Sequence, residues 1–87
     1  MYEDIILEII QHVKDDIEVD KLEINKIRKE INKLKKCIKE SQELEINNEN
    51  LETELITRKH FINNIKEKIN KEKKAIYRLN KAMELLK

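Results

Sequence analysis

The sequence predicts an all-α protein: two long helices packed as an antiparallel coiled-coil hairpin. The first observation is that the 87 residues contain no glycine and no proline, so few tight turns are expected. The second is composition: 43% of the residues are charged and only 3% are aromatic, as in long-helix proteins. The third is that apolar side chains recur every seven residues in two stretches, a repeat typical of left-handed coiled coils.

The first repeat predicts a helix over residues 20–46. In this frame, nine of the ten inward positions a and d are apolar: Ile6, Ile10, Val13, Ile17, Ile24, Ile27, Ile31, Leu34 and Ile38. The exception is Asp20, which has Glu23 three residues later and so matches a helix N-cap. We therefore expect residues 1–16 to form an apolar N-terminal helical segment, either a separate short helix or a bent start of the long one.

The second repeat predicts a helix over residues 51–86. Nine of its eleven inward positions are apolar: Leu51, Leu55, Ile62, Ile65, Ile69, Ile76, Leu79, Met83 and Leu86. The exceptions are Arg58 and Glu72. Polar residues at such positions either extend their heads outward or fix the register and the choice of partner.

The two repeats are out of phase, because 17 residues separate Ile38 from Leu55, two heptads plus three. The phase changes within residues 40–52, ESQELEINNENLE, which hold three of the nine asparagines. Asparagine can end one helix and cap the next, so we expect a turn near residues 47–50. The alternative is one near-continuous helix that forms an antiparallel rod dimer. Either way, residues 1–87 form a single domain.

The two architectures predict different pairings and lengths. The hairpin pairs Ile27 with Ile69 and Leu34 with Ile62, whereas the rod pairs Ile27 with Ile62 and Leu34 with Leu55. Both pairings place position a against position d, so the number of apolar layers hardly separates them. At about 1.5 Å per helical residue, the hairpin would be roughly 60–70 Å long and the rod roughly 130 Å.

Charge is distributed in blocks, although the formal net charge is only +1. Residues 1–20 hold seven acids and one lysine, whereas residues 21–40 and 61–87 each hold eight bases and three acids. Lysine-rich bands can contact phosphates. The alternative function is therefore a nucleic-acid-associated coiled coil, with these candidate contacts: Arg28, Lys29, Lys33, Lys36, Lys71, Lys74 and Arg78.

Enzymatic chemistry finds little support in this sequence. His12 and His60 fall at outer heptad positions, and no metal-ligand spacing is present. No glycine loop is available to bind phosphate, and a slim helical protein offers no deep pocket. We expect no enzyme activity, no cofactor and no metal.

Residues 41–45, SQELE, resemble the Ser-Gln-Glu-Leu-Asp signature of small helical-hairpin phosphatases of the bacterial sporulation phosphorelay. Glu45 stands where that signature has aspartate, and no glycine loop precedes the motif. The resemblance covers five residues, and we expect no phosphatase activity from it.

The expected function is that of a non-enzymatic interaction protein: an adapter, small regulator or assembly factor. A lone two-helix seam buries little surface, and small chains often compensate by oligomerising, so we expect a homodimer. The single Cys37 and the absence of a signal-like or membrane-spanning stretch predict a cytoplasmic, soluble protein. We expect a protein partner to dock on the apolar N-terminal end, through Ile5, Ile6, Ile9, Ile10, Val13, Met83 and Leu86.

Overall fold

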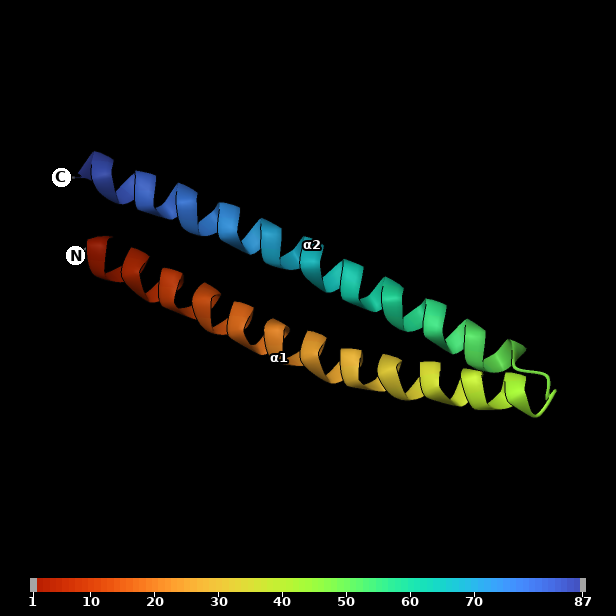
Figure 1. Ribbon diagram of the computed structural model, residues 1–87. Coiled ribbons are helices and arrows are strands. Elements are labelled where there is room, and N and C mark those ends of the chain that lie inside the picture. Colours follow the sequence, from red (N-terminus) through yellow and green to blue (C-terminus); the bar gives the residue numbers. More distant parts are fainter. Residues whose placement is uncertain (1, 87) are drawn as a thin grey trace.

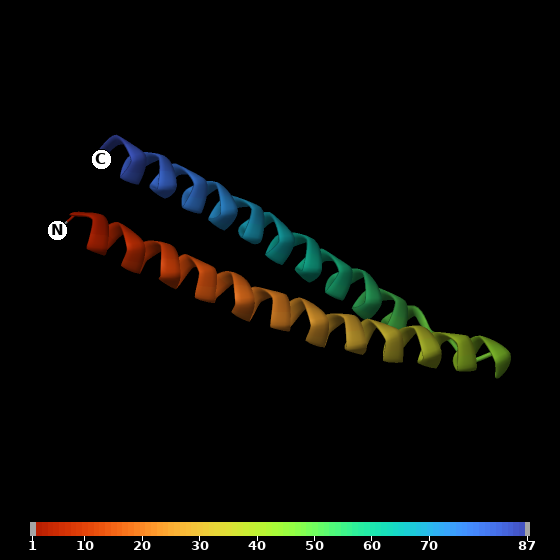
Figure 2. The ribbon, with the colours of Figure 1, turned by 60° about the vertical axis from the view of Figure 1, so that its left-hand side comes forward.

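The computed structural model describes residues 2–86, which form a helical hairpin. Helix α1 spans Tyr2–Glu43 and helix α2 spans Glu49–Leu86. The two run antiparallel and side by side over their whole length, with both ends of the chain at the same end of the molecule (Figures 1 and 2). The extents are 67 × 15 × 13 Å. The predicted hairpin is therefore confirmed, and the rod of about 130 Å is excluded for the single chain.

A seam of isoleucines holds the two helices together. Its buried residues are Ile10, Ile17, Ile24, Ile27, Ile31, Ile62 and Ile69, each 5–7% exposed. Every predicted inward position of both repeats is buried or half-buried except Leu86. Side chains seven residues apart lie on one stripe of each helix, so both stripes can face each other along the hairpin.

Helix α1 runs without interruption past Asp20, so the N-terminal segment is the start of the long helix and not a separate short one. Asp20 lies inside the helix, and because the helix is continuous there, Ile17 and Ile24 fall on the same buried stripe. A break there would have rotated one of these side chains out of the seam. Helix α1 also ends at Glu43 rather than residue 46, and α2 begins at Glu49 rather than residue 51. Residues 1 and 87, the limits of the predicted domain, lie outside the described residues.

Residues 44–48 form the turn, and Glu45 determines how α1 ends. The Ile46 amide donates to the Ser41 carbonyl at 2.9 Å, and the Glu45 amide donates to the Gln42 carbonyl at 3.2 Å. This pair of bonds is the Schellman arrangement, which needs a left-handed residue just after the helix. Glu45 is that residue, with φ at 57°, although it carries the side chain that glycine avoids.

Asparagines start the second helix. The Asn47 side-chain oxygen accepts the Glu49 amide at 3.0 Å, and the Asn48 carbonyl accepts the first helical bond, from the Glu52 amide, at 3.0 Å. The side-chain bond satisfies one of the amides that a helix N-terminus leaves free. Glu49 and Asn50, which the sequence had placed in the turn, therefore belong to α2.

The register of the seam differs by about one heptad from the pairing expected for a hairpin. Glu30 pairs with Arg58, and Asp20 pairs with Lys68. The expected pairing would separate the partners of each pair by eight residues along the axis, about 12 Å. The observed register places Ile27 level with Ile62, the pairing that the sequence had assigned to the rod. The turn at residues 44–48, earlier than expected, explains the shift.

Neither helix, within residues 2–86, contains a segment apolar and long enough to cross a membrane.

Replacing Glu45 with glycine should stabilise the hairpin, because glycine adopts a left-handed conformation without the steric penalty of a side chain. We expect the free energy of unfolding to rise by about 0.5–1 kcal/mol, measured by urea denaturation followed by circular dichroism. Glu43→Gly is the control: it lies in the last turn of α1 and should destabilise by up to about 1 kcal/mol. Equal effects of the two substitutions would contradict this account of the turn.

Candidate functional site

The hairpin has two long edges, one on each side of the seam, and they differ in chemistry. In an antiparallel pair the g positions of both helices lie along one edge and the e positions along the other, because turning one helix end for end exchanges the sides of its e and g positions relative to a parallel pair. We call the first the groove edge; its members are Ile9, Asp16, Glu23, Glu30, Cys37, Glu54, Phe61, Lys68, Ala75 and Ala82. Among them Glu30, Ala75 and Ala82 are half-buried and the others exposed.

A shallow groove lies on this edge, near the middle of the molecule. Its volume is about 340 Å³, and it is lined by Glu23, Ile27, Glu30, Glu54, Thr57, Arg58, Phe61 and Ile65. The Phe61 ring is 54% exposed. Water therefore reaches an aromatic ring between two apolar seam residues and three glutamates. This combination suits contact with another protein surface better than chemistry on a small molecule.

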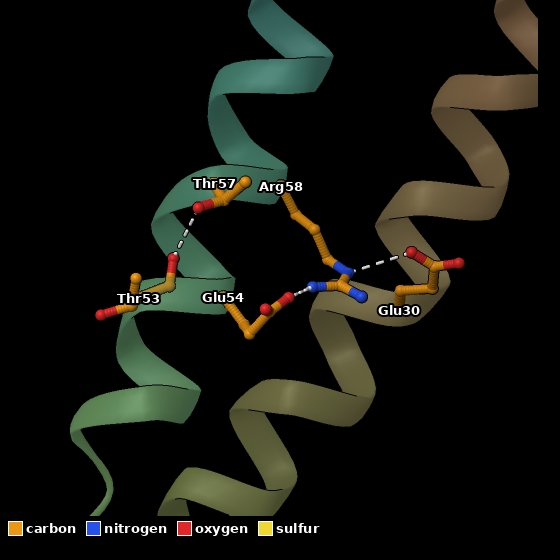
Figure 3. A network of polar contacts seen from close by, with 5 residues as sticks. All are labelled: Glu30, Thr53, Glu54, Thr57 and Arg58. Carbon is orange, nitrogen blue, oxygen red and sulfur yellow. Dashed lines mark hydrogen bonds and ion pairs between the residues drawn. The ribbon is translucent and has the colours of Figure 1, made fainter.

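Arg58 lines the groove and bridges the two helices (Figure 3). Its Nε donates to Glu30 of α1 at 3.0 Å, and its Nη1 donates to Glu54 on its own helix. These hydrogen bonds, the one to Glu54 first, raise the pKa of the Arg58 guanidinium. On the turn below, Thr57 donates to the Thr53 carbonyl at 2.9 Å. Arg58, which occupies an inward heptad position, therefore joins the two helices by an ion pair.

A second polar cluster joins the helices at Asp20, Lys68 and Glu72. Lys68 Nζ lies 3.1 Å from Asp20 Oδ1 and 3.8 Å from Glu72 Oε1. The Asp20 and Glu72 side chains are only 13% and 14% exposed. Three of their carboxylate oxygens are buried and accept no hydrogen bond among residues 2–86: Asp20 Oδ2 and both oxygens of Glu72. Burying such atoms without a donor costs stability.

Burial raises the pKa of Glu72, and the neighbouring Asp20 carboxyl raises it further, while Lys68 acts in the opposite direction. The hydrogen bond to Asp20 in turn raises the pKa of Lys68. An acid whose pKa is raised by folding lowers the stability of the folded state at neutral pH, because it is still ionised there. The cluster is therefore a weak point of the seam that lies outside the groove.

The residues predicted to dock a partner divide into two groups. Ile10 is buried and Ile6, Val13 and Met83 are half-buried, so these four belong to the seam. Ile5, Ile9 and Leu86 are 43–51% exposed. Because the start of α1 and the end of α2 lie at the same end of the hairpin (Figure 1), exposed apolar residues of both helices occur at that end. We call this set the open end: Tyr2, Ile5, Leu7, Ile9, Leu85 and Leu86.

The residues predicted to contact nucleic acid do not gather on one surface. All seven are exposed. Arg28 occupies an e position, whereas Lys29, Lys36 and Lys74 occupy f positions on the outermost faces. Lys33, Lys71 and Arg78 occupy c positions on the outer side of the groove edge. The predicted set includes one e position, Arg28, and leaves out the other basic e positions, because it was chosen by runs along the chain and not by heptad position.

Within residues 2–86 no group of three His, Cys, Asp or Glu side chains is arranged to hold a metal ion. The described residues form a helical hairpin with exposed charged and apolar side chains on its two long edges and at its open end. No protein-family model matches this chain, and no curated protein or solved structure shows significant similarity to it.

Replacing Glu72 with leucine should stabilise the hairpin, because it removes two buried oxygens that accept no hydrogen bond and extends the apolar seam. At pH 7 we expect a gain of about 1 kcal/mol or more, or roughly 4–8 °C in melting temperature for each kcal/mol. The gain should shrink as the pH falls, because the raised pKa lets the wild-type Glu72 take up a proton in the folded state before it does in the unfolded chain.

Thermal melts followed by circular dichroism between pH 5 and 7.5 measure both effects. Glu67→Leu is the matched control, because Glu67 lies at an outer f position of the same helix and is exposed. It should change the melting temperature little and independently of pH. A Glu72→Leu protein that melts below wild type at pH 7 would show that Glu72 does not lie in the seam.

Proposed function

We propose that this chain is a non-enzymatic coiled-coil interaction protein. It forms a homodimer through the groove edge and docks a protein partner at its open end. The observation that carries the proposal is the exposure of Phe61 within a groove whose floor is the seam itself. The roles of adapter, small regulator or assembly factor all fit such a module.

Self-association follows from how little the hairpin buries alone. The seam is one layer deep, and no side chain among residues 2–86 is less than 2% exposed. Ordering each residue opposes folding by about 1–2 kcal/mol, so chains of this size usually gain stability from oligomerisation. A second copy laid along the groove edge would cover Phe61 and extend the half-buried stripe of Ala75 and Ala82. Two hairpins packed in this way form a four-helix bundle.

The open end supplies a second surface of different character. Leu85 is 88% exposed, Tyr2 70% and Ile5 50%. Clustered exposed apolar side chains mark interaction sites on soluble proteins. No comparable ion pairs cover this end, since the inter-helix pairs Arg58–Glu30 and Lys68–Asp20 lie nearer the middle of the described chain. The partner we propose is a protein with an apolar docking face.

Substituting Phe61 with serine should weaken dimerisation, because the ring is the largest apolar group on the groove edge. Sedimentation equilibrium over a concentration series should show a dimer dissociation constant at least about tenfold weaker, equivalent to about 1.4 kcal/mol. Tyr77→Ser is the matched control, since Tyr77 is an aromatic of similar exposure, 63% against 54%, at a b position. A wild-type protein that stays monomeric at high micromolar concentration would overturn the proposed dimer.

The double substitution Ile5→Glu with Leu85→Glu should abolish partner docking and leave the dimer intact. The control is Val19→Glu with Leu22→Glu, two exposed apolar residues of α1 away from the open end, 64% and 68% exposed. Affinity capture from the source cells, quantified by mass spectrometry, should recover a protein with wild type and the control but not with the open-end variant. Equal recovery by all three proteins would contradict docking at the open end.

A further inference from the structure

The second long edge of the hairpin carries bases from both helices, and we call it the basic edge. It consists of the e positions Lys14, Lys21, Arg28 and Lys35 of α1 and Lys59, Lys66 and Lys73 of α2. All seven are exposed. Glu18, at a neighbouring b position, pairs with Lys21 at 3.4 Å, and one e position close to the turn, Glu52, is acidic. The other six bases form no ion pair within residues 2–86.

The register of the hairpin sets these bases against one another. The register set by the ion pairs Glu30–Arg58 and Asp20–Lys68 brings Arg28 within one residue of Lys59, about 1.5 Å along the axis. By the same offset, Lys21 lies level with Lys66, and Lys14 with Lys73. Positions e and g of coiled coils ordinarily carry opposite charges that attract across the interface. Like charges that face each other destabilise the folded hairpin. Folding therefore brings these bases close enough to repel one another, and a bound anion would relieve that repulsion.

The groove edge shows the contrast. There the inter-helix contacts are attractive, because Glu30 meets Arg58 and Asp20 meets Lys68. The ion pairs that join the two helices therefore all lie at the seam or on the groove edge. Across the basic edge three pairs of bases face each other, and among the described residues only Lys21 of these six has an acid partner, which lies on its own helix. Each pair follows the last by seven residues, about 10.5 Å along the axis.

The neighbours of the basic edge favour phosphate over other anionic ligands. Asn25, Asn32, Asn63 and Asn70 occupy the adjoining b positions and are exposed. Side-chain amides donate hydrogen bonds to phosphate oxygens, as lysine and arginine do. The e and b positions of residues 14–35 and 59–73 hold no aromatic residue on which a base could stack. The next b position, Tyr77, lies one turn beyond Lys73, and its ring is already in contact with Lys81, whose Nζ is 5.6 Å from the ring centre. Contacts here would be made to a backbone, without reading bases.

We propose that the basic edge binds the phosphate backbone of a nucleic-acid duplex, independently of sequence. A straight body 67 Å long with cations at a fixed repeat suits a stiff, straight polyanion better than a flexible single strand. Lysine, a point charge without the planar fork of arginine, gives affinity without base recognition. This activity goes beyond self-association and uses the opposite side of the seam from the groove edge.

The test compares two quadruple variants that lose the same charge. The edge variant replaces Lys14, Lys21, Lys66 and Lys73 with glutamine and so removes two facing pairs. The control replaces Lys29, Lys36, Lys74 and Lys81, four exposed lysines at f positions, also two on each helix. Binding is measured by fluorescence anisotropy with a labelled mixed-sequence DNA duplex of about 20 base pairs, at salt concentrations from about 50 to 200 mM.

The edge variant should bind the duplex at least about tenfold more weakly at low salt, with a salt dependence smaller by about three charges. The control should stay within about threefold of wild type. Without DNA, the edge variant should melt at a higher temperature than the control, because facing like charges are gone. Sedimentation equilibrium should show the same association state for both variants, which separates this proposal from the proposed dimer.

Three results would overturn the proposal. The first is no binding of the duplex by wild type at about 50 mM salt. The second is an equal loss of affinity in both variants, which would mean that net charge alone governs binding. The third is equal or tighter binding to polyglutamate, or to vesicles containing anionic lipid, which would assign the edge to a different polyanion.

Discussion

The isoleucine seam is the constraint on which every other feature of this hairpin depends. Ile10, Ile17, Ile24 and Ile31 recur every seven residues and are among the most buried side chains. They fix which side of α1 faces α2, and thereby which residues fall on each edge. Lys21 is exposed on one edge and Glu23 on the other because Ile24 is buried between them. The surface chemistry is thus a consequence of the packing.

The heptad frames predicted the buried positions well because burial follows a local, repeated rule. They could not predict the register, since sliding one helix by a heptad still sets isoleucine against isoleucine. The register depends on where α1 ends. Helix α1 ends just before Glu45, which adopts a left-handed conformation, and a glutamate in the sequence gives no signal for that conformation. The spacing of Asp20 to Glu23 also suits a helix N-cap. In the structure, the burial of Ile17 and Ile24 on one stripe outweighs this local signal, and the helix continues.

The partial site predictions have the same origin. The apolar end was identified from composition, but the sequence did not separate Ile10, which is buried in the seam, from Ile5, which stays exposed. The lysine runs were read along the chain, whereas an edge is made of residues seven apart on two helices. Lys21 and Lys66 are 45 positions apart in sequence and are brought level only by the register. Surfaces that two helices build jointly are the part that a linear reading misses.

The five-residue turn also shapes how the molecule forms and opens. Closing a short loop loses little chain entropy, and each later pair of seam residues adds beside one already formed. Folding can therefore proceed as a zipper from the turn, by the local contacts that make helical proteins fold fast. Opening should start at the other end, where Ile5 and Leu85 are exposed. A partner bound there would act as a clasp and lengthen the lifetime of the whole hairpin.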